Sequence, residues 1–159
     1  MQPIRLIVTL TLALAGYFVP AHAAGQDAEA QVRNAVDGLF EAMRTVDGAR
    51  AAALFHPEAR LLSVSESNGA SFLSATPATE FVQAVGTPRT DLWDERISGL
   101  EIRVDGNMAT AWMNYGFFLG GQFSHCGVNA FQLFRGTSGW QIVQITDTRR
   151  QQGCEEWSR

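Results

Sequence analysis

The apolar positions near the start of the chain recur with a helical period and predict an amphipathic helix. One face of this helix carries only apolar side chains, namely Val32, Ala35, Val36, Leu39, Phe40 and Met43. Asp27 is a suitable N-cap for the helix. The segment Val46-Asp47-Gly48 interrupts the pattern, so we expect the helix to end there.

Two shorter helices are expected downstream. Asp47 can cap the first of them, which should end near Leu54-Phe55, because His56 precedes Pro57 and is therefore disfavoured in helical geometry. The second should begin at Thr76-Pro77 and end at Gly86, with a buried stripe of Phe81, Val82 and Val85. Both predictions rest on start and stop signals as well as on apolar spacing.

The segment between the two short helices predicts two short strands. Residues 60–65 alternate loosely between polar and apolar, and Asn68-Gly69 is typical of a hairpin turn. Phe72 and Leu73 then mark a second short strand. After the third helix, we expect residues 87–94 to form a loop, with Asp91, Asp94, Glu95 and Arg96 on a solvated loop face.

Four long strands are predicted in the rest of the chain. They cover residues 96–104, 108–119, 124–135 and 140–150, which are rich in β-branched and aromatic residues. We expect turns at Asp105-Gly106, at Gly120-Gly121 and between Gly136 and Gly139. Helices with short strands, followed by such a meander, predict an α+β fold. The helices should cover one face of a mostly antiparallel sheet.

Tight turns at both ends of a strand fix its pairing, so the register can be counted from them. Counting from the turn at 136–139 places Asp147 opposite Val128. The same count places Arg149 opposite Cys126. The side chains can then be assigned to the two faces of the sheet by alternation.

The alternation gives one mostly apolar face and one mixed face. The face expected under the helices carries Leu100, Ile102, Val104, Ala109, Ala111, Met113, Tyr115, Phe117, Cys126, Val128, Ala130, Gln132, Val143, Ile145, Asp147 and Arg149. The other face carries Glu101, Arg103, Thr110, Trp112, Asn114, His125, Asn129, Phe131, Leu133, Trp140, Ile142, Gln144, Thr146 and Thr148. A mixture of large apolar and polar groups is typical of a subunit interface, and Trp112, Phe131 and Trp140 are its expected anchors.

A few polar side chains fall on the helix-facing side of the predicted sheet. Tyr115, Gln132, Asp147 and Arg149 are these residues, and with Met113 they form the predicted ligand-binding set. Asp147 and Arg149 project from the same face two residues apart, and a buried charge needs a partner. The pair is therefore either a structural ion pair or the polar end of an apolar pocket.

Composition excludes several classes of protein. The chain has 159 residues, of which 46% are hydrophobic, so it can bury the core of one domain. Its 12 basic residues are all arginines, they form no basic patch larger than the adjacent pair Arg149-Arg150, and the formal net charge is −4, which argues against a nucleic-acid groove. The sequence contains no nucleophile-elbow serine, no phosphate-binding glycine loop and no pattern that indicates a cofactor.

The first 23 residues are typical of a cleaved secretory signal. Arg5 precedes the apolar run 6–18, and Ala21-His22-Ala23 matches a signal-peptidase site. Residues 24–159 would then form a single mature domain in the periplasm or outside the cell, with no membrane attachment.

The two cysteines have to be interpreted in that compartment. An oxidising environment favours a disulfide between Cys126 and Cys154. Two free thiols, or a metal site that includes His125, are the alternatives, but two residues fall short of the four ligands of a structural zinc site. The sequence therefore predicts a disulfide and no metal.

The order of elements resembles the cone-shaped fold shared by nuclear transport factor 2, the ketosteroid isomerases and the SnoaL-like polyketide cyclases. More narrowly, the chain from about residue 28 to Cys154 is similar to the putative lumazine-binding family. The motifs that carry this similarity are L-F-H-P-E-A-R-L at 54–61, V-D-G-N-M-A-T-A-W at 104–112, S-H-C-G-V-N-A-F-Q-L-F-R at 124–135, G-W-Q-I-V at 139–143 and D-T-R-R at 147–150.

The resemblance implies a curved sheet wrapped on three helices, a pocket inside the cone, and homodimers formed through the outer face of the sheet. It does not imply a particular reaction. Members of the family often carry an acidic residue where this chain has Asn129. The isomerases need a tyrosine on the first helix, whereas the only tyrosine of the mature chain is Tyr115.

Three functions remain open from the sequence. The first is a binder of a small apolar or aromatic molecule without catalysis. The second is an isomerase, dehydratase or cyclase in which Asp147 is the general base and Tyr115 stabilises the oxyanion, although Arg149 would stabilise the charged carboxylate and weaken it as a base. The third is an interaction module that dimerises through Trp112, Phe131 and Trp140.

Overall fold

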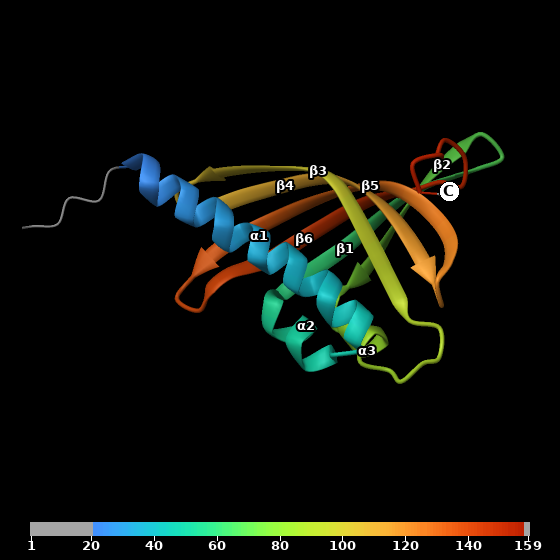
Figure 1. Cartoon of the computed structure of the whole chain (residues 1–159), viewed down its shortest axis with the longest axis horizontal. Coiled ribbons are helices and arrows are strands. Elements are labelled where there is room, and N and C mark those ends of the chain that lie inside the picture. The colour runs from blue at the N-terminus through green and yellow to red at the C-terminus, as the bar shows by residue number, and fades with distance from the viewer. Residues whose placement is uncertain (1–20, 158–159) are drawn as a thin grey trace, which may run out of the picture.

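The apolar stripe near the start of the chain folds into α1 (Ala21–Thr45), and a six-stranded sheet curves around it (Figure 1). The structure is a computed structural model that describes residues 21–157. Helix α1 begins six residues before the expected Asp27, while residues 1–20 of the predicted signal segment lie outside the described part. No helix within the described residues is long and apolar enough to cross a membrane.

The two short helices lie where the sequence predicts them. Helix α2 (Gly48–Leu54) is capped by Asp47, whose carboxylate accepts a hydrogen bond of 2.8 Å from the backbone N–H of Arg50. Helix α3 (Ala78–Val85) begins directly after Pro77. Helix α2 packs on α1, and α3 packs on α2 and β1, so both short helices lie near the same end of the sheet (Figure 1).

The strands form one mixed sheet in the order β2-β1-β6-β5-β4-β3. Their bounds are β1 (Phe55–Ser67), β2 (Ala70–Pro77), β3 (Trp93–Asp105), β4 (Met108–Leu119), β5 (Gln122–Gly136) and β6 (Gly139–Arg149). Only β1 and β6 run parallel. The predicted α+β cone is confirmed, but β3 begins at Trp93, so the end of the expected loop 87–94 belongs to the sheet.

The register of the last two strands differs from the predicted one because of two bulges. The pairing of β4 with β5 shifts by one residue at Ser124, and that of β5 with β6 shifts at Val143. Asp147 therefore lies opposite Asn129 instead of Val128, and Cys126 bridges to Arg150 instead of Arg149. An extra residue in one strand reverses which face the following side chains occupy.

The first bulge corrects the predicted faces of β5. Asn129, Phe131 and Leu133 point toward the helices and are buried, whereas Gln132 is exposed on the outer face. The second bulge cancels the effect of the first on the later part of β6. Ile145, Asp147 and Arg149 therefore face the helices, as predicted. In the part of β6 before Val143, the face is the opposite of the predicted one. Trp140 and Ile142 therefore face the helices there, in place of the expected Val143.

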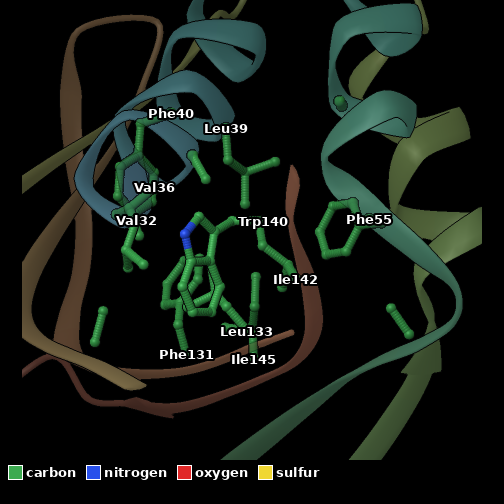
Figure 2. Close-up of a cluster of buried hydrophobic side chains, with 14 of the residues drawn as sticks. Val32, Val36, Leu39, Phe40, Phe55, Phe131, Leu133, Trp140, Ile142 and Ile145 are labelled. Carbon is green, nitrogen blue, oxygen red and sulfur yellow. The ribbon is translucent and has the colours of Figure 1, made fainter. Parts of the chain in front are cut away.

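The main core lies between α1 and the strands β5 and β6 (Figure 2). Its largest contributors are Val32, Val36, Leu39 and Phe40 from α1 and Phe131, Leu133, Trp140, Ile142 and Ile145 from the sheet. The rings of Phe40 and Phe131 meet edge to face, with centroids 6.0 Å apart. The predicted apolar face of the first helix is thus confirmed as the centre of the core.

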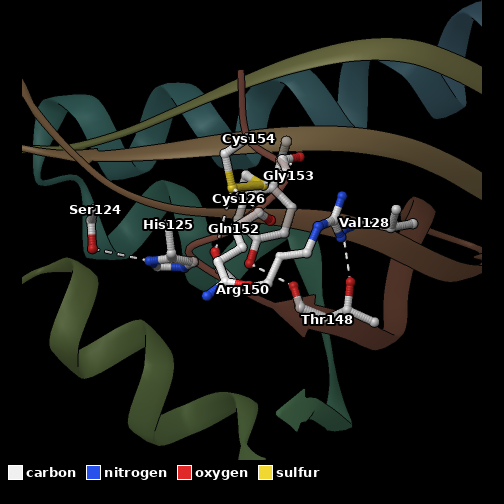
Figure 3. Close-up of a disulfide and its surroundings, with 10 residues drawn as sticks. Ser124, His125, Cys126, Val128, Thr148, Arg150, Gln152, Gly153 and Cys154 are labelled. Atoms are coloured by element: carbon white, nitrogen blue, oxygen red, sulfur yellow. Dashed lines mark hydrogen bonds between the residues drawn. A yellow bond between two sulfur atoms is a disulfide. The ribbon is translucent and has the colours of Figure 1, made fainter. Parts of the chain in front are cut away.

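A disulfide between Cys126 and Cys154 ties the C-terminal tail to β5, as predicted (Figure 3). The Cα atoms are 5.8 Å apart, within the ordinary range for a disulfide. Backbone hydrogen bonds of 2.9 and 3.0 Å join Cys126 to Arg150 beside it. Trp157 packs on Gly116, where a Cβ atom would lie only 2.5 Å from the indole ring. The tail is therefore an integral part of this end of the sheet.

Removal of the disulfide should destabilise the fold, because the bond closes a loop between residues 28 positions apart. Replacing both cysteines by serine should lower the free energy of unfolding by about 3 kcal/mol in urea denaturation. The control is the same comparison under a thiol reductant, in which the two proteins should become alike. An unchanged unfolding midpoint in the oxidised protein would contradict this account of the tail.

Candidate functional site

A cavity of about 290 Å³ lies inside the cone between the helices and the sheet. Its apolar lining consists of Leu39, Phe40, Met43, Leu61, Phe81, Trp93, Phe117, Leu119, Phe131 and Ile145. Its polar lining consists of Glu95, Tyr115, His125, Asn129, Asp147 and Arg149. Largely apolar walls with a few convergent polar groups are typical of small-molecule sites.

One wall of the cavity is a row of aromatic rings. Phe81 and Trp93 stack with centroids 6.3 Å apart, and Trp93 meets the edge of Phe117 at 6.1 Å. His125 continues the row, with its centroid 5.0 Å from that of Phe117. Stacking partners of this kind fit a flat, unsaturated ligand better than a flexible chain.

Asp147 is the centre of the polar end of the cavity. Its side chain is only 10% exposed, and three donors surround it. Ser63 donates at 2.5 Å to one carboxylate oxygen, while Arg149 Nε donates at 2.7 Å to the other, and the Tyr115 hydroxyl lies 3.3 Å from that second oxygen. Side chains from β1, β4 and β6 thus converge on this one carboxylate.

The two groups beside Asp147 are fixed in their protonation states. The single hydroxyl proton of Tyr115 is shared between the Asp147 carboxylate at 3.3 Å and the backbone carbonyl of Thr148 at 2.9 Å. Burial together with the nearby charge of Asp147 raises the pKa of Tyr115. Burial works to lower the pKa of Arg149, but the Asp147 carboxylate more than offsets it, so the pKa is raised. Tyr115 is therefore a neutral phenol, and Arg149 is a cation.

Glu95 is a second carboxyl group in the cavity, and its environment is different. Its one hydrogen bond comes from Asn129 Nδ2 at 2.5 Å. Burial raises the pKa of Glu95 to about 7, and the charge of Asp147 adds to that effect, while Asn129 and Arg149 oppose it. Near neutral pH this carboxyl group can thus be found with or without its proton.

His125 completes the polar lining. Burial and the charge of Arg149 lower its pKa, so the imidazole is neutral at physiological pH. Its Nδ1 atom lies 3.0 Å from the hydroxyl of Ser124. The ring can therefore serve as a neutral hydrogen-bonding wall but not as a cation.

The structure brings together only part of the predicted binding set. Tyr115, Asp147 and Arg149 line the cavity, whereas Met113 is buried in the core outside its lining. Gln132 is on the outer face, because the bulge at Ser124 reverses the faces of β5. This placement removes Gln132 from the candidate site.

Sequence reasoning missed Glu95, Asn129 and His125 as cavity residues. The bulge at Ser124 brings Asn129 and His125 to the inner side. Glu95 was expected in a solvated loop, but a register shift between Ser98 and Glu101 turns it inward. Gly99, in the left-handed region with φ of 62°, is the one sequence signal for that shift.

The expected anchors of the outer face are divided between two environments. Trp112 is 54% exposed on that face. Phe131 and Trp140, in contrast, are buried against the helices, since both follow the corrected faces of their strands. Among the described residues, no group of three or more histidine, cysteine or acidic side chains is arranged to hold a metal ion.

Solved structures with the same fold share little sequence with this chain. A nuclear transport factor 2-like superfamily protein from Salmonella enterica is 16% identical, with a TM-score of 0.62 over 82% of this chain and 97% of that one. A protein with a cystatin-like fold from Novosphingobium aromaticivorans is 14% identical, with a TM-score of 0.65 over 84% of this chain and 89% of that one. A protein from Streptomyces avermitilis described as a putative dehydratase is 15% identical, with a TM-score of 0.61 over 79% of this chain and 97% of that one. These likenesses establish the cone fold alone.

The sequence itself gives a more specific assignment. A comparison with curated proteins finds no match. The profile of the family described as "Putative lumazine-binding" matches residues 27–146, which include most of α1 and most of the sheet. The chain therefore belongs to the putative lumazine-binding family.

Proposed function

We propose that this protein binds a small, partly aromatic molecule inside the cone. The observation that carries the proposal is a cavity of about 290 Å³ with aromatic walls and one polar end. A flat ring system can lie against the row of Phe81, Trp93 and Phe117, while a hydrogen-bonding substituent can reach Arg149 or Glu95. Membership of a family described as lumazine-binding is consistent with a heteroaromatic ligand.

We also propose that binding takes place in the periplasm or outside the cell, after cleavage near Ala24. The disulfide between Cys126 and Cys154 supports this location, because such bonds persist in oxidising compartments. A homodimer is proposed through the outer face of the sheet. Exposed apolar residues there, Trp112 and Phe134, support it in place of the buried Phe131 and Trp140.

A second candidate function is acid–base catalysis, and the pair of unlike carboxyl groups favours it. Asp147 is surrounded by three donors, which leaves it poorly placed to accept a proton from a substrate. Glu95 has one donor and a pKa of about 7, suited to proton transfer at neutral pH. In this reading Glu95 replaces Asp147 as the base for an isomerase or dehydratase reaction, and Arg149 stabilises the developing anion.

Filling the cavity tests the binding proposal. Leu61→Trp places a larger ring in the cavity, and Leu73→Trp makes the same change on the neighbouring strand at a residue that is 66% exposed. We expect native mass spectrometry of protein purified from the periplasm to show a retained small molecule in the natural protein and in Leu73→Trp. The Leu61→Trp protein should lack it.

Repeated preparations of the natural protein without bound mass would count against a binding function. Equal retention by both tryptophan variants would place the ligand outside the cavity.

The pKa of Glu95 predicts how stability depends on pH. Because this pKa rises from an ordinary 4.5 to about 7 on folding, the folded protein holds the proton more tightly than the unfolded chain. Stability from this group is present below pH 4.5 and is lost as the pH rises through 7, by up to about 3 kcal/mol. Glu95→Gln should remove this loss, so its stability relative to the natural protein should increase between pH 5 and pH 8 in urea unfolding.

The matched control is Glu101→Gln, an exposed carboxylate on the same strand. It should keep the natural pH dependence. If Glu95→Gln also kept it, Glu95 would titrate normally and the catalytic candidate would lose its support.

A further inference from the structure

A second, polar hollow adjoins the cavity at its open end. It is lined by Glu66, Asn68, His125, Arg149, Arg150, Gln151 and Gln152. His125 and Arg149 line both the hollow and the cavity, so these two side chains form the boundary between them. A molecule held in the cavity can therefore extend past them into the hollow.

Arg149 is held at this boundary in a fixed orientation. Its Nε atom donates to the buried Asp147 carboxylate, yet the side chain is 53% exposed. Within the described residues, its terminal nitrogens make no hydrogen bond. A guanidinium anchored through Nε keeps its outer N–H groups free for a planar or tetrahedral anion.

Arg150 adds charge that no neighbouring side chain neutralises by an ion pair. Among the described residues it forms no salt bridge, whereas Arg149 is paired with Asp147. Amide groups of Gln151, Gln152 and Asn68 supply further donors in the same hollow. Glu66 is the one carboxylate in the lining, so the hollow suits a group with a single negative charge better than a highly charged one.

The C-terminal tail builds this hollow. Arg150, Gln151 and Gln152 lie between β6 and Cys154, which is bonded to Cys126 next to His125 (Figure 3). The two backbone hydrogen bonds between Cys126 and Arg150 fix the start of the tail. The hollow is thus made from a segment that the disulfide holds against the mouth of the cavity.

We propose that the polar hollow is the outer half of the ligand site and binds an anionic substituent, such as a carboxylate or sulfonate, carried by an aromatic body in the cavity. This inference rests on the proposed binding function and names the chemical class of its ligand. Arg149 and Arg150 contact the anionic group, and the aromatic row of Phe81, Trp93 and Phe117 contacts the ring system.

A pair of fluorescent dyes tests the inference. Anilinonaphthalene sulfonate and phenylnaphthylamine share one aromatic skeleton, but only the first carries an anion. We expect the sulfonate to bind the natural protein about tenfold more tightly, since a charge-assisted hydrogen bond contributes about 1.5–3 kcal/mol. Arg150→Gln should remove most of this difference and leave the affinity for the neutral dye within about twofold.

Arg33→Gln, which removes an exposed arginine of α1, is the matched control and should change neither affinity. Leu61→Trp should abolish binding of both dyes. Equal affinities for the two dyes, or an Arg150→Gln variant that still prefers the sulfonate, would overturn the anionic site and leave the cavity proposal intact. If neither dye binds, or Leu61→Trp affects neither, both proposals fail.

Discussion

The buried Asp147 carboxylate is the interaction on which the rest of the site depends. A charge in this position is tolerated only because β1, β4 and β6 each provide a donor: Ser63, Tyr115 and Arg149. These contacts join three strands at the polar end of the cone. They also hold Arg149 at the mouth of the cavity, where its outer face remains accessible. The pair of Asp147 and Arg149 is thus both a structural ion pair and the polar end of the pocket, the two alternatives that the sequence left open.

The cavity is defined by the contrast between its two carboxyl groups. Asp147 lies among three donors, whereas Glu95 lies among aromatic rings and, within the described residues, has a single donor, Asn129. One fold therefore provides a donor-rich carboxylate and a carboxyl group that titrates near neutral pH within the same pocket. The disulfide-bonded tail shapes the remaining side, because Cys154 is bonded to Cys126 and the tail residues Arg150, Gln151 and Gln152 line the polar hollow with His125. The proposed binding function and the candidate acid–base catalysis would use the same cavity. Which of the two takes place depends on whether the bound molecule has a proton that Glu95 can remove.

The sequence alone predicts the helices and the strand order of the meander, because helix caps and tight turns are local signals. It also predicts the disulfide, because two cysteines behind a predicted secretory signal favour one. It also places Tyr115, Asp147 and Arg149 on the inner side, although for Asp147 and Arg149 this success depends on two shifts that cancel. The bulged Ser124 and Val143 are ordinary strand residues, so alternation alone cannot reveal them. Glu95 was missed for the same physical reason: a shift in β3 reverses its face.

The most direct test of the central claim is a double-mutant cycle between Asp147→Asn and Arg149→Gln, with the free energy of unfolding measured in urea. Asp147→Asn removes the negative charge at constant size, and Arg149→Gln removes the positive charge and shortens the side chain while it keeps an amide donor. If the pair holds the polar end of the cone together, each single change destabilises the protein, and the coupling energy is about 1 kcal/mol or more. Effects that add to within about 0.3 kcal/mol would show that the two groups act independently and would contradict this account.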